Sequence, residues 1–222
     1  MNITIDDREK VAAAIRAAEA TTDGEINAVI STSSDTYNDV VLHWALLAAL
    51  LPLAASAAWP GLLHWGASLL TGGWDDPSLR LMLTLLLLKT GFVFLVARWL
   101  IGIPSVRLAL TPHATIARRV RRRAIMLFRA GTERRTATRT GVLLYVSLAE
   151  HRAEIVADAS IHSKVAPEAW GDAMAALIAE IREGRPGEGL SAAIGKIGAI
   201  LAEHFPFTGT DPNEMPDRLI EL

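Results

Sequence analysis

The sequence contains no cysteine. This absence excludes disulfide bonds, thiol nucleophiles, zinc ribbons and iron–sulfur ligation, so histidine and carboxylate side chains are the strong metal ligands that remain. Aromatic residues are scarce, at 6% of the 222 residues, although 51% of the chain is hydrophobic and the mean hydropathy is +0.29. Leu, Ala, Ile and Val therefore carry an apolar excess above that of an ordinary soluble domain, and this excess excludes a disordered chain.

The sequence also lacks the short motifs that mark common enzyme classes. It has no His-Glu-x-x-His, no P-loop, no Gly-x-Gly-x-x-Gly and no Gly-x-Ser-x-Gly. Each of these motifs carries a defined piece of metal, phosphate, dinucleotide or nucleophile chemistry. Any site must therefore be sought in residues that are brought together from separate segments.

Two long apolar stretches dominate the first half of the chain. The first runs from Val40 through Trp59 without Asp, Glu, Lys or Arg, and the second runs from Leu81 to Ile103. About 20 residues suffice to cross about 30 Å of hydrocarbon. A core helix of a soluble protein usually keeps a polar stripe, so the pattern favours membrane spans. We expect a two-helix transmembrane hairpin at residues 40–103.

Charge on either side of the spans predicts their orientation. The connector from Pro60 to Ser78 contains no Lys or Arg. Arginines gather after the second span: Arg107, Arg118, Arg119, Arg121, Arg122, Arg123, Arg129, Arg134, Arg135 and Arg139. The positive-inside rule places this flank in the cytoplasm, and two spans return the N-terminal segment to the same side. We therefore expect a multi-pass protein of a bacterial-type inner membrane, with both termini cytoplasmic.

The remaining segments predict helices and strands. In the first segment, Asp6 and Glu9 resemble a capping box for a helix, and Glu25–Ser31 alternates like a strand. The second segment predicts a helix after Thr111-Pro112, strands at Gly141–Leu148 and Arg152–Asp158, and helices from Pro167 to Gly184 and from Leu190 onward.

The first segment is too short to bury a core by itself. We therefore expect an α/β fold, a central sheet flanked by helices and interrupted by the transmembrane hairpin. Residues 1–39 and 104–206 form its two parts, and residues 207–222 form an irregular tail.

Four of these segments resemble a known family. They are Arg139–Leu148, Arg152–Asp158, Val165 with Trp170, and the helix from Leu190 to Phe205. Together they are similar to the TPM domain family, and most similar to its bacterial membrane-bound branch. The resemblance implies a central sheet flanked by helices. Acid phosphatase activity and calcium binding are proposed for some members, and Asp158 matches the end of the family's strand. Calcium is thus the cofactor that the resemblance allows, and no other cofactor is predicted.

The arginine-rich helix offers the clearest surface chemistry. Five arginines, Arg118, Arg119, Arg121, Arg122 and Arg123, are predicted to lie on the face away from Ile116, Val120 and Leu127. Near a membrane, each basic side chain contributes about 1 kcal/mol of attraction to anionic lipid. The same residues could serve only to set topology. Aromatic residues for stacking are not interleaved with them, so we expect no nucleic-acid binding.

Lys89 lies near the middle of the second predicted span. An ammonium group there costs roughly 2.5 to 3.5 kcal/mol on insertion scales, which marks it as a candidate site. Its partner would be His43 or a carboxylate of another protein or copy of the chain; alternatively, a shifted span lets it reach the interface.

The distances between carboxylates around the strand hairpin distinguish two candidate functions, a binding module and a hydrolase. Glu154 and Asp158 are about 13 Å apart along an extended strand and cannot chelate one ion together. We expect a binding or assembly module at the membrane surface that contacts anionic lipid and another membrane protein or a second copy. The alternative is a phosphatase-like hydrolase with a divalent-ion site, and carboxylates converging within about 4 to 6 Å would favour it.

Overall fold

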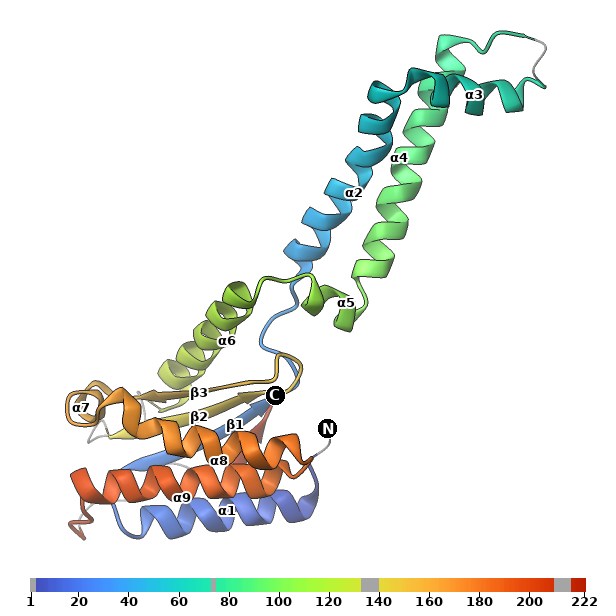
Figure 1. Cartoon of the computed structure of the whole chain (residues 1–222). Coiled ribbons are helices and arrows are strands. Elements are labelled where there is room, and N and C mark those ends of the chain that lie inside the picture. Colours follow the sequence, from blue (N-terminus) through green and yellow to red (C-terminus); the bar gives the residue numbers. More distant parts are fainter. Residues whose placement is uncertain (1–2, 73–74, 133–139, 210–216) are drawn as a thin grey trace. The chain divides into compact units, whose positions relative to one another are not determined.

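The computed structural model describes residues 3–72, 75–132, 140–209 and 217–222. The chain divides into two compact units. The sheet unit comprises Met1–Asp35 and Ala114–Leu222, and the hairpin unit comprises Thr36–His113 (Figure 1). The hairpin unit is thus an insertion in the sequence of the sheet unit.

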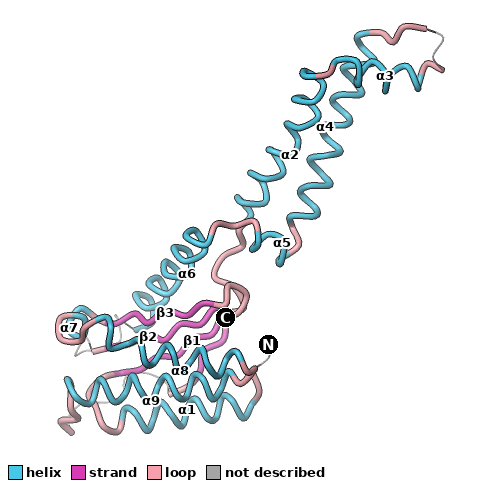
Figure 2. Tube along the Cα trace, in the orientation of Figure 1, coloured by secondary structure: helices cyan, strands magenta, loops and turns pink. Residues whose placement is uncertain are grey.

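A mixed sheet forms the centre of the sheet unit (Figure 2). Its strands are β1 (Glu25–Ser31), β2 (Gly141–Ser147), β3 (Arg152–Ala157) and β4 (Leu219–Glu221), in the order β3-β2-β1-β4. β1 is parallel to β2 and to β4, whereas β2 and β3 form an antiparallel hairpin. The predicted central sheet is confirmed, and the strand before the hairpin unit pairs along its whole length with the first strand after it.

The expected irregular tail is corrected by β4. This strand lies in residues 207–222 and pairs with β1 from Ala28 to Ile30. Glu221 also forms an ion pair with Arg8, with 2.5 Å between Nε and Oε1. Three residues are too few to show an alternating pattern in sequence. The strand forms because β1 would otherwise present an unpaired edge.

Three helices cover one face of the sheet: α1 (Ile5–Glu19), α8 (Gly171–Arg182) and α9 (Pro186–His204) (Figure 1). Ile26, Ala28 and Ile30 of β1 belong to the same buried core as residues of these helices. Leu177 and Ile194 are fully buried there. Helix α9 begins at Pro186, earlier than the predicted Leu190, because a proline suits the first turn of a helix.

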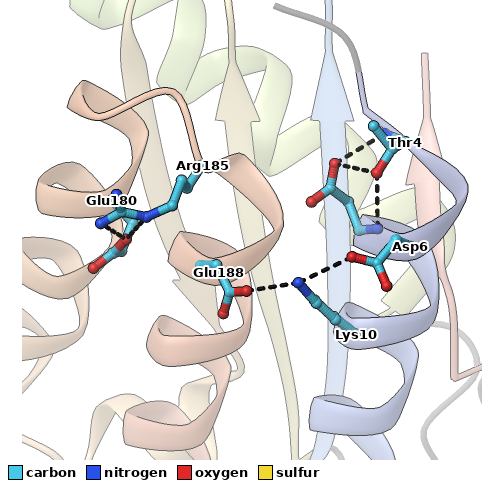
Figure 3. Close-up of polar contacts among 7 residues, drawn as sticks. Thr4, Asp6, Lys10, Glu180, Arg185 and Glu188 are labelled. Atoms are coloured by element: carbon cyan, nitrogen blue, oxygen red, sulfur yellow. Dashed lines mark hydrogen bonds and ion pairs between the residues drawn. The ribbon is translucent and has the colours of Figure 1, made fainter.

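The N-terminal cap of α1 differs from the prediction. Thr4, not Asp6, caps the helix, and Asp7 completes the capping box (Figure 3). The Thr4 backbone and hydroxyl donate to the Asp7 carboxylate at 2.9 and 2.7 Å and lower the pKa of Asp7. Asp6 instead pairs with Lys10, whose ammonium group also donates to Glu188 of α9 at 2.7 Å. Thr4 is the N-cap because its hydroxyl accepts the backbone N–H of Asp7 while its own backbone stays extended.

Close packing between α1 and α9 depends on glycine. A Cβ atom built on Gly198 would lie 2.5 Å from the Cβ of Ala18. Real side-chain carbons do not approach so closely, so the two helices could not keep this distance with alanine at position 198. Gly195, on the same helix, has open space around it.

The other face of the sheet is covered by α6 (His113–Leu127), which lies opposite α1, α8 and α9 (Figure 1). Its stripe of Ile116, Val120 and Ala124 is buried. A π-helical turn, Phe128–Thr132, follows α6. Short helical turns at Ala159–His162 (α7) and Pro167–Trp170 (η2) precede α8.

The hairpin unit contains α2 (Asn38–Ala58), α3 (Pro60–Leu70), α4 (Leu79–Ile101) and α5 (Pro104–Ala109). Helices α2 and α4 pack side by side through small α2 residues such as Ala45 and Ala49 (Figure 1). Both are long and apolar enough to cross a membrane. The sequence predicted a connector at Pro60–Ser78 and did not predict α3 or α5, because their periodicity is hidden in apolar surroundings.

Candidate functional site

The arginines of α6 divide into two groups. Arg119 forms an ion pair with Asp35 at 3.0 Å, and Arg121 forms one with Glu154 of β3 at 3.1 Å. Arg118 and Arg122 are exposed, and Arg123 is half-buried. Two of the five arginines predicted to contact lipid thus have guanidinium groups that also reach carboxylates of the sheet unit, although the Arg121 side chain is still 63% exposed. Arg134, Arg135 and Arg139 lie outside the described residues.

A chain of hydroxyl groups fixes the segment that follows β1. Ser34 Oγ lies 2.9 Å from the Tyr145 hydroxyl and donates to Ser147 Oγ at 2.9 Å. Ser147 in turn donates a hydrogen bond to Glu150. The Glu150 carboxylate also accepts from the Ser34 backbone at 2.8 Å and from the Ser33 hydroxyl at 3.2 Å. These bonds hold the segment at the carboxyl ends of β1 and β2.

An ion pair joins the points at which the chain leaves and re-enters the sheet unit. The last residue of the first segment, Asp35, is bonded to Arg119, which lies five residues after the re-entry at Ala114. Five helical residues span about 7.5 Å. The chain therefore leaves and re-enters the sheet unit close together.

Lys89 lies on an exposed surface of α4. Among the described residues no ion pair or hydrogen bond of its ammonium group is found. His43, its predicted intrachain partner, places its Nδ1 atom 2.6 Å from the backbone oxygen of Asp39 in its own helix. A partner for Lys89 would thus come from outside the described chain.

The Asp158 carboxylate binds the backbone of the neighbouring strand β2. The residue is buried, and its carboxylate accepts the backbone N–H of Gly141 at 2.9 Å, which joins the end of β3 to the start of β2. Glu154 is occupied by Arg121. In the described part of the chain, no group of three or more His, Asp or Glu residues is suited to hold a metal ion.

Carboxylates do converge at the amino ends of β1 and β4. Glu19, Glu25 and Asp217 line a pocket of about 300 Å³, together with Arg16, Ala20, Thr22, Gly24 and Phe207. Burial, together with the smaller effect of the charges of Glu25 and Asp217, raises the pKa of Glu19 to about 8. The Ile26 backbone N–H, which donates to Glu19 at 2.8 Å, opposes the rise. The pocket therefore holds a carboxyl group that is largely protonated at neutral pH.

Sequence reasoning missed this acidic pocket. Glu19 is an acidic residue at the C-terminal end of a helix, where the helix dipole disfavours negative charge, and this conflict is a usable signal. Glu25 opens a buried strand, which is also unusual for a charged residue. Asp217 gave no signal, because only the pairing of β4 brings it to the pocket.

Comparison with known proteins supports the fold. No family model matches the chain, and no curated protein matches it. The structure is similar to the NMR structure of the BA42 protein from the psychrophilic bacterium Bizionia argentinensis, with a TM-score of 0.58 and 18% sequence identity. The match covers 100% of this chain and 97% of the other. At this identity the likeness concerns the fold alone.

Proposed function

We propose that this chain is an integral membrane protein whose TPM-like α/β domain acts as a binding or assembly module at the cytoplasmic surface of a bacterial-type inner membrane. The observation that carries the proposal is the exposure of apolar side chains on α4. None of its most apolar 18-residue window is buried, although the mean hydropathy of that window is 2.0. A helix with this surface is stable in hydrocarbon, where its backbone groups are already paired.

Two features support the placement of the sheet unit at the membrane surface. The arginines of α6 follow the second apolar helix directly in sequence, as expected for a cytoplasmic flank. The chain leaves and re-enters the sheet unit close together, beside the Asp35–Arg119 ion pair. Two spans that begin and end on one side of the membrane require this arrangement.

Within the set of arginines proposed to contact anionic lipid, Arg118 and Arg122 are the most available for that contact. Both are exposed, and neither has an ion-pair partner among the described residues. At about 1 kcal/mol for each basic side chain, two arginines supply weak attraction that adds to the anchoring by the spans.

Topology is tested with reporter fusions. A reporter that is active only outside the cytoplasm, fused at Asp75, should be active, and the same reporter after Leu222 should be inactive. An active reporter after Leu222 would contradict the proposed orientation.

Lipid contact is tested with the full chain in liposomes. A fluorophore on a cysteine introduced at Met126, which is 49% exposed on α6, should transfer energy to labelled anionic lipid more efficiently than to labelled neutral lipid. Arg118→Ala combined with Arg122→Ala should abolish the difference. Arg182→Ala, an exposed arginine of α8, is the matched control and should retain it. Equal transfer to both lipids in the parent chain would contradict the proposed lipid contact.

The assembly role is tested by purification in mild detergent. Another membrane protein, or a second copy of the chain, should co-purify with the parent and be lost from Lys89→Leu, because this variant lacks the ammonium group that would bind the partner. A partner that is retained by Lys89→Leu would contradict the role of Lys89, and the absence of a partner in both samples would contradict assembly.

A phosphatase-like hydrolase is the second candidate function, and the convergence of Glu19, Glu25 and Asp217 favours it. The pocket lies at the amino end of β1, whereas α/β proteins bind ligands at the carboxyl ends of their parallel strands. Hydrolysis of an aryl phosphate that is lost in Glu19→Gln would support this alternative. No hydrolysis by the parent chain, with or without calcium, would rule against it.

A further inference from the structure

Helix α3 is too short to cross a membrane. Its 11 residues span about 16 Å, roughly half the thickness of the hydrocarbon core. It contacts both α2 and α4 at their connected ends (Figure 1). Ala67 is fully buried at this contact, so one side of α3 is fixed on the hairpin.

The outer side of α3 carries an apolar stripe. Leu62 is 55% exposed, and Trp65 and Leu69 are each 63% exposed. Their spacing of three and four residues places them on one side of the helix. Three large apolar side chains in one exposed row are costly in water, at about 25 cal/mol for each Å² of apolar surface.

Polar groups gather on another side of α3. His64 faces Asp76, with 3.7 Å between Nε2 and Oδ1. The Thr71 hydroxyl donates to the backbone oxygen of Asp75 at 3.1 Å. The connector after α3 thus folds back toward the polar side and leaves the apolar stripe uncovered.

We infer that α3 is an interfacial helix that inserts Leu62, Trp65 and Leu69 into the boundary between lipid headgroups and acyl chains, on the side of the membrane remote from the cytoplasm. This inference rests on the proposed membrane crossing by α2 and α4. The stripe lies on a helix that contacts both apolar helices, and tryptophan favours the headgroup zone. The absence of Lys and Arg between Pro60 and Ser78 suits the side remote from the cytoplasm.

The experiment uses single cysteines, because the chain has none of its own. A nitroxide is attached at Leu62, Trp65 or Leu69 of the stripe, at His64 or Asp76 of the polar side, and at Leu87 near the middle of α4. Each labelled full-length chain is reconstituted in vesicles of phosphatidylcholine and phosphatidylglycerol. Collisions with oxygen, which partitions into lipid, and with a water-soluble nickel complex report the surroundings of each label.

Labels at the three stripe positions should collide less with the nickel complex and more with oxygen than the labels at His64 and Asp76 do. The stripe labels should also lie less deep in the bilayer than the label at Leu87. Labels at His64 and Asp76 should remain accessible to the nickel complex. If the stripe labels are as water-accessible as those at His64 and Asp76 while Leu87 is in lipid, the inference about α3 is wrong and the membrane crossing stands. A water-accessible label at Leu87 would overturn the membrane crossing and, with it, this inference.

Discussion

The sheet unit and the hairpin unit use apolar residues in opposite ways. In the sheet unit, Leu177 and Ile194 are fully buried between helices and sheet. In the hairpin unit, Leu87 is 72% exposed and Phe92 is 67% exposed. Apolar surface is driven out of water, so the two units differ in how much apolar surface they leave to their surroundings. The high mean hydropathy of the chain is therefore the average of two different kinds of structure.

The two units also differ in the surroundings of their arginine and lysine side chains. In the sheet unit, Arg119 and Arg121 are paired with carboxylates that come from other segments of the chain. In the hairpin unit, Lys89 lies on an exposed helix surface. A charge at a water-exposed surface costs little, but the same charge in hydrocarbon needs a partner. The environment, rather than the residue type, decides whether a cation marks a candidate site.

Truncation of a buried residue should have the largest effect. Ile194→Ala removes a fully buried side chain and leaves a cavity, so the sheet unit should lose about 2–5 kcal/mol of unfolding free energy. Hydrogen exchange of β2 in detergent measures this loss. The matched change Leu87→Ala in the hairpin unit should alter the exchange of α4 by about 0.5 kcal/mol or less. Equal effects of the two changes would contradict the division into a core-packed and a surface-apolar unit.

Addition of one methyl group between α1 and α9 should have a smaller effect. Gly198→Ala places a Cβ atom 2.5 Å from that of Ala18 and should cost about 1–3 kcal/mol through overpacking. Gly195→Ala, in open space on the same helix, should instead stabilise α9 by up to about 1 kcal/mol. The hydrogen exchange of α9 distinguishes the two variants, and a stabilising Gly198→Ala would show that the helices can move apart freely.

The acidic pocket should make the stability of the sheet unit depend on pH. The pKa of Glu19 rises from an ordinary value of 4.5 to about 8 in the folded chain. The folded state therefore holds this proton more tightly, and stability should fall as the pH rises from about 4.5 through about 8. Glu19→Gln should remove the contribution of Glu19 to this loss of stability at higher pH. Unfolding experiments at pH 5, 7 and 9 measure the change. Glu168→Gln, an exposed position, is the control, and parallel pH profiles of the parent and Glu19→Gln would contradict the raised pKa.

The ion pairs of α6 should contribute least. Glu154→Gln breaks the pair with Arg121, whose side chain is 63% exposed, and should cost at most about 1 kcal/mol. The same change frees a third arginine, so energy transfer to anionic lipid should rise in the liposome assay. A fall in transfer would mean that Arg121 already contacts lipid through its present position.

Sequence patterns predicted the elements that are long and regular. The strands at Glu25–Ser31 and Gly141–Ser147 and the two long apolar helices were predicted within a few residues, because each repeats one periodicity over its length. The cap of α1 at Thr4 and the start of α9 at Pro186 were missed by a few residues. Both errors occur at helix ends, where several residues compete to satisfy the same backbone N–H groups.

Much less of the candidate site could be predicted. The five arginines of α6 looked alike in sequence, yet Asp35 and Glu154 distinguish Arg119 and Arg121 from the others. The acidic pocket joins Glu19, Glu25 and Asp217 from three segments of the chain. No spacing rule connects these residues, because the contact depends on the pairing of β4 with β1.

The sequence by itself determined that this chain has two long apolar helices and an interrupted α/β domain, because apolar runs and periodicities are local properties. Only the tertiary structure decided that β1 and β2 are neighbours, that the last residues form a strand, and which charges are paired. Those features depend on contacts between residues far apart in the chain, where the gain from burial and hydrogen bonding must exceed the entropy lost when the chain is ordered.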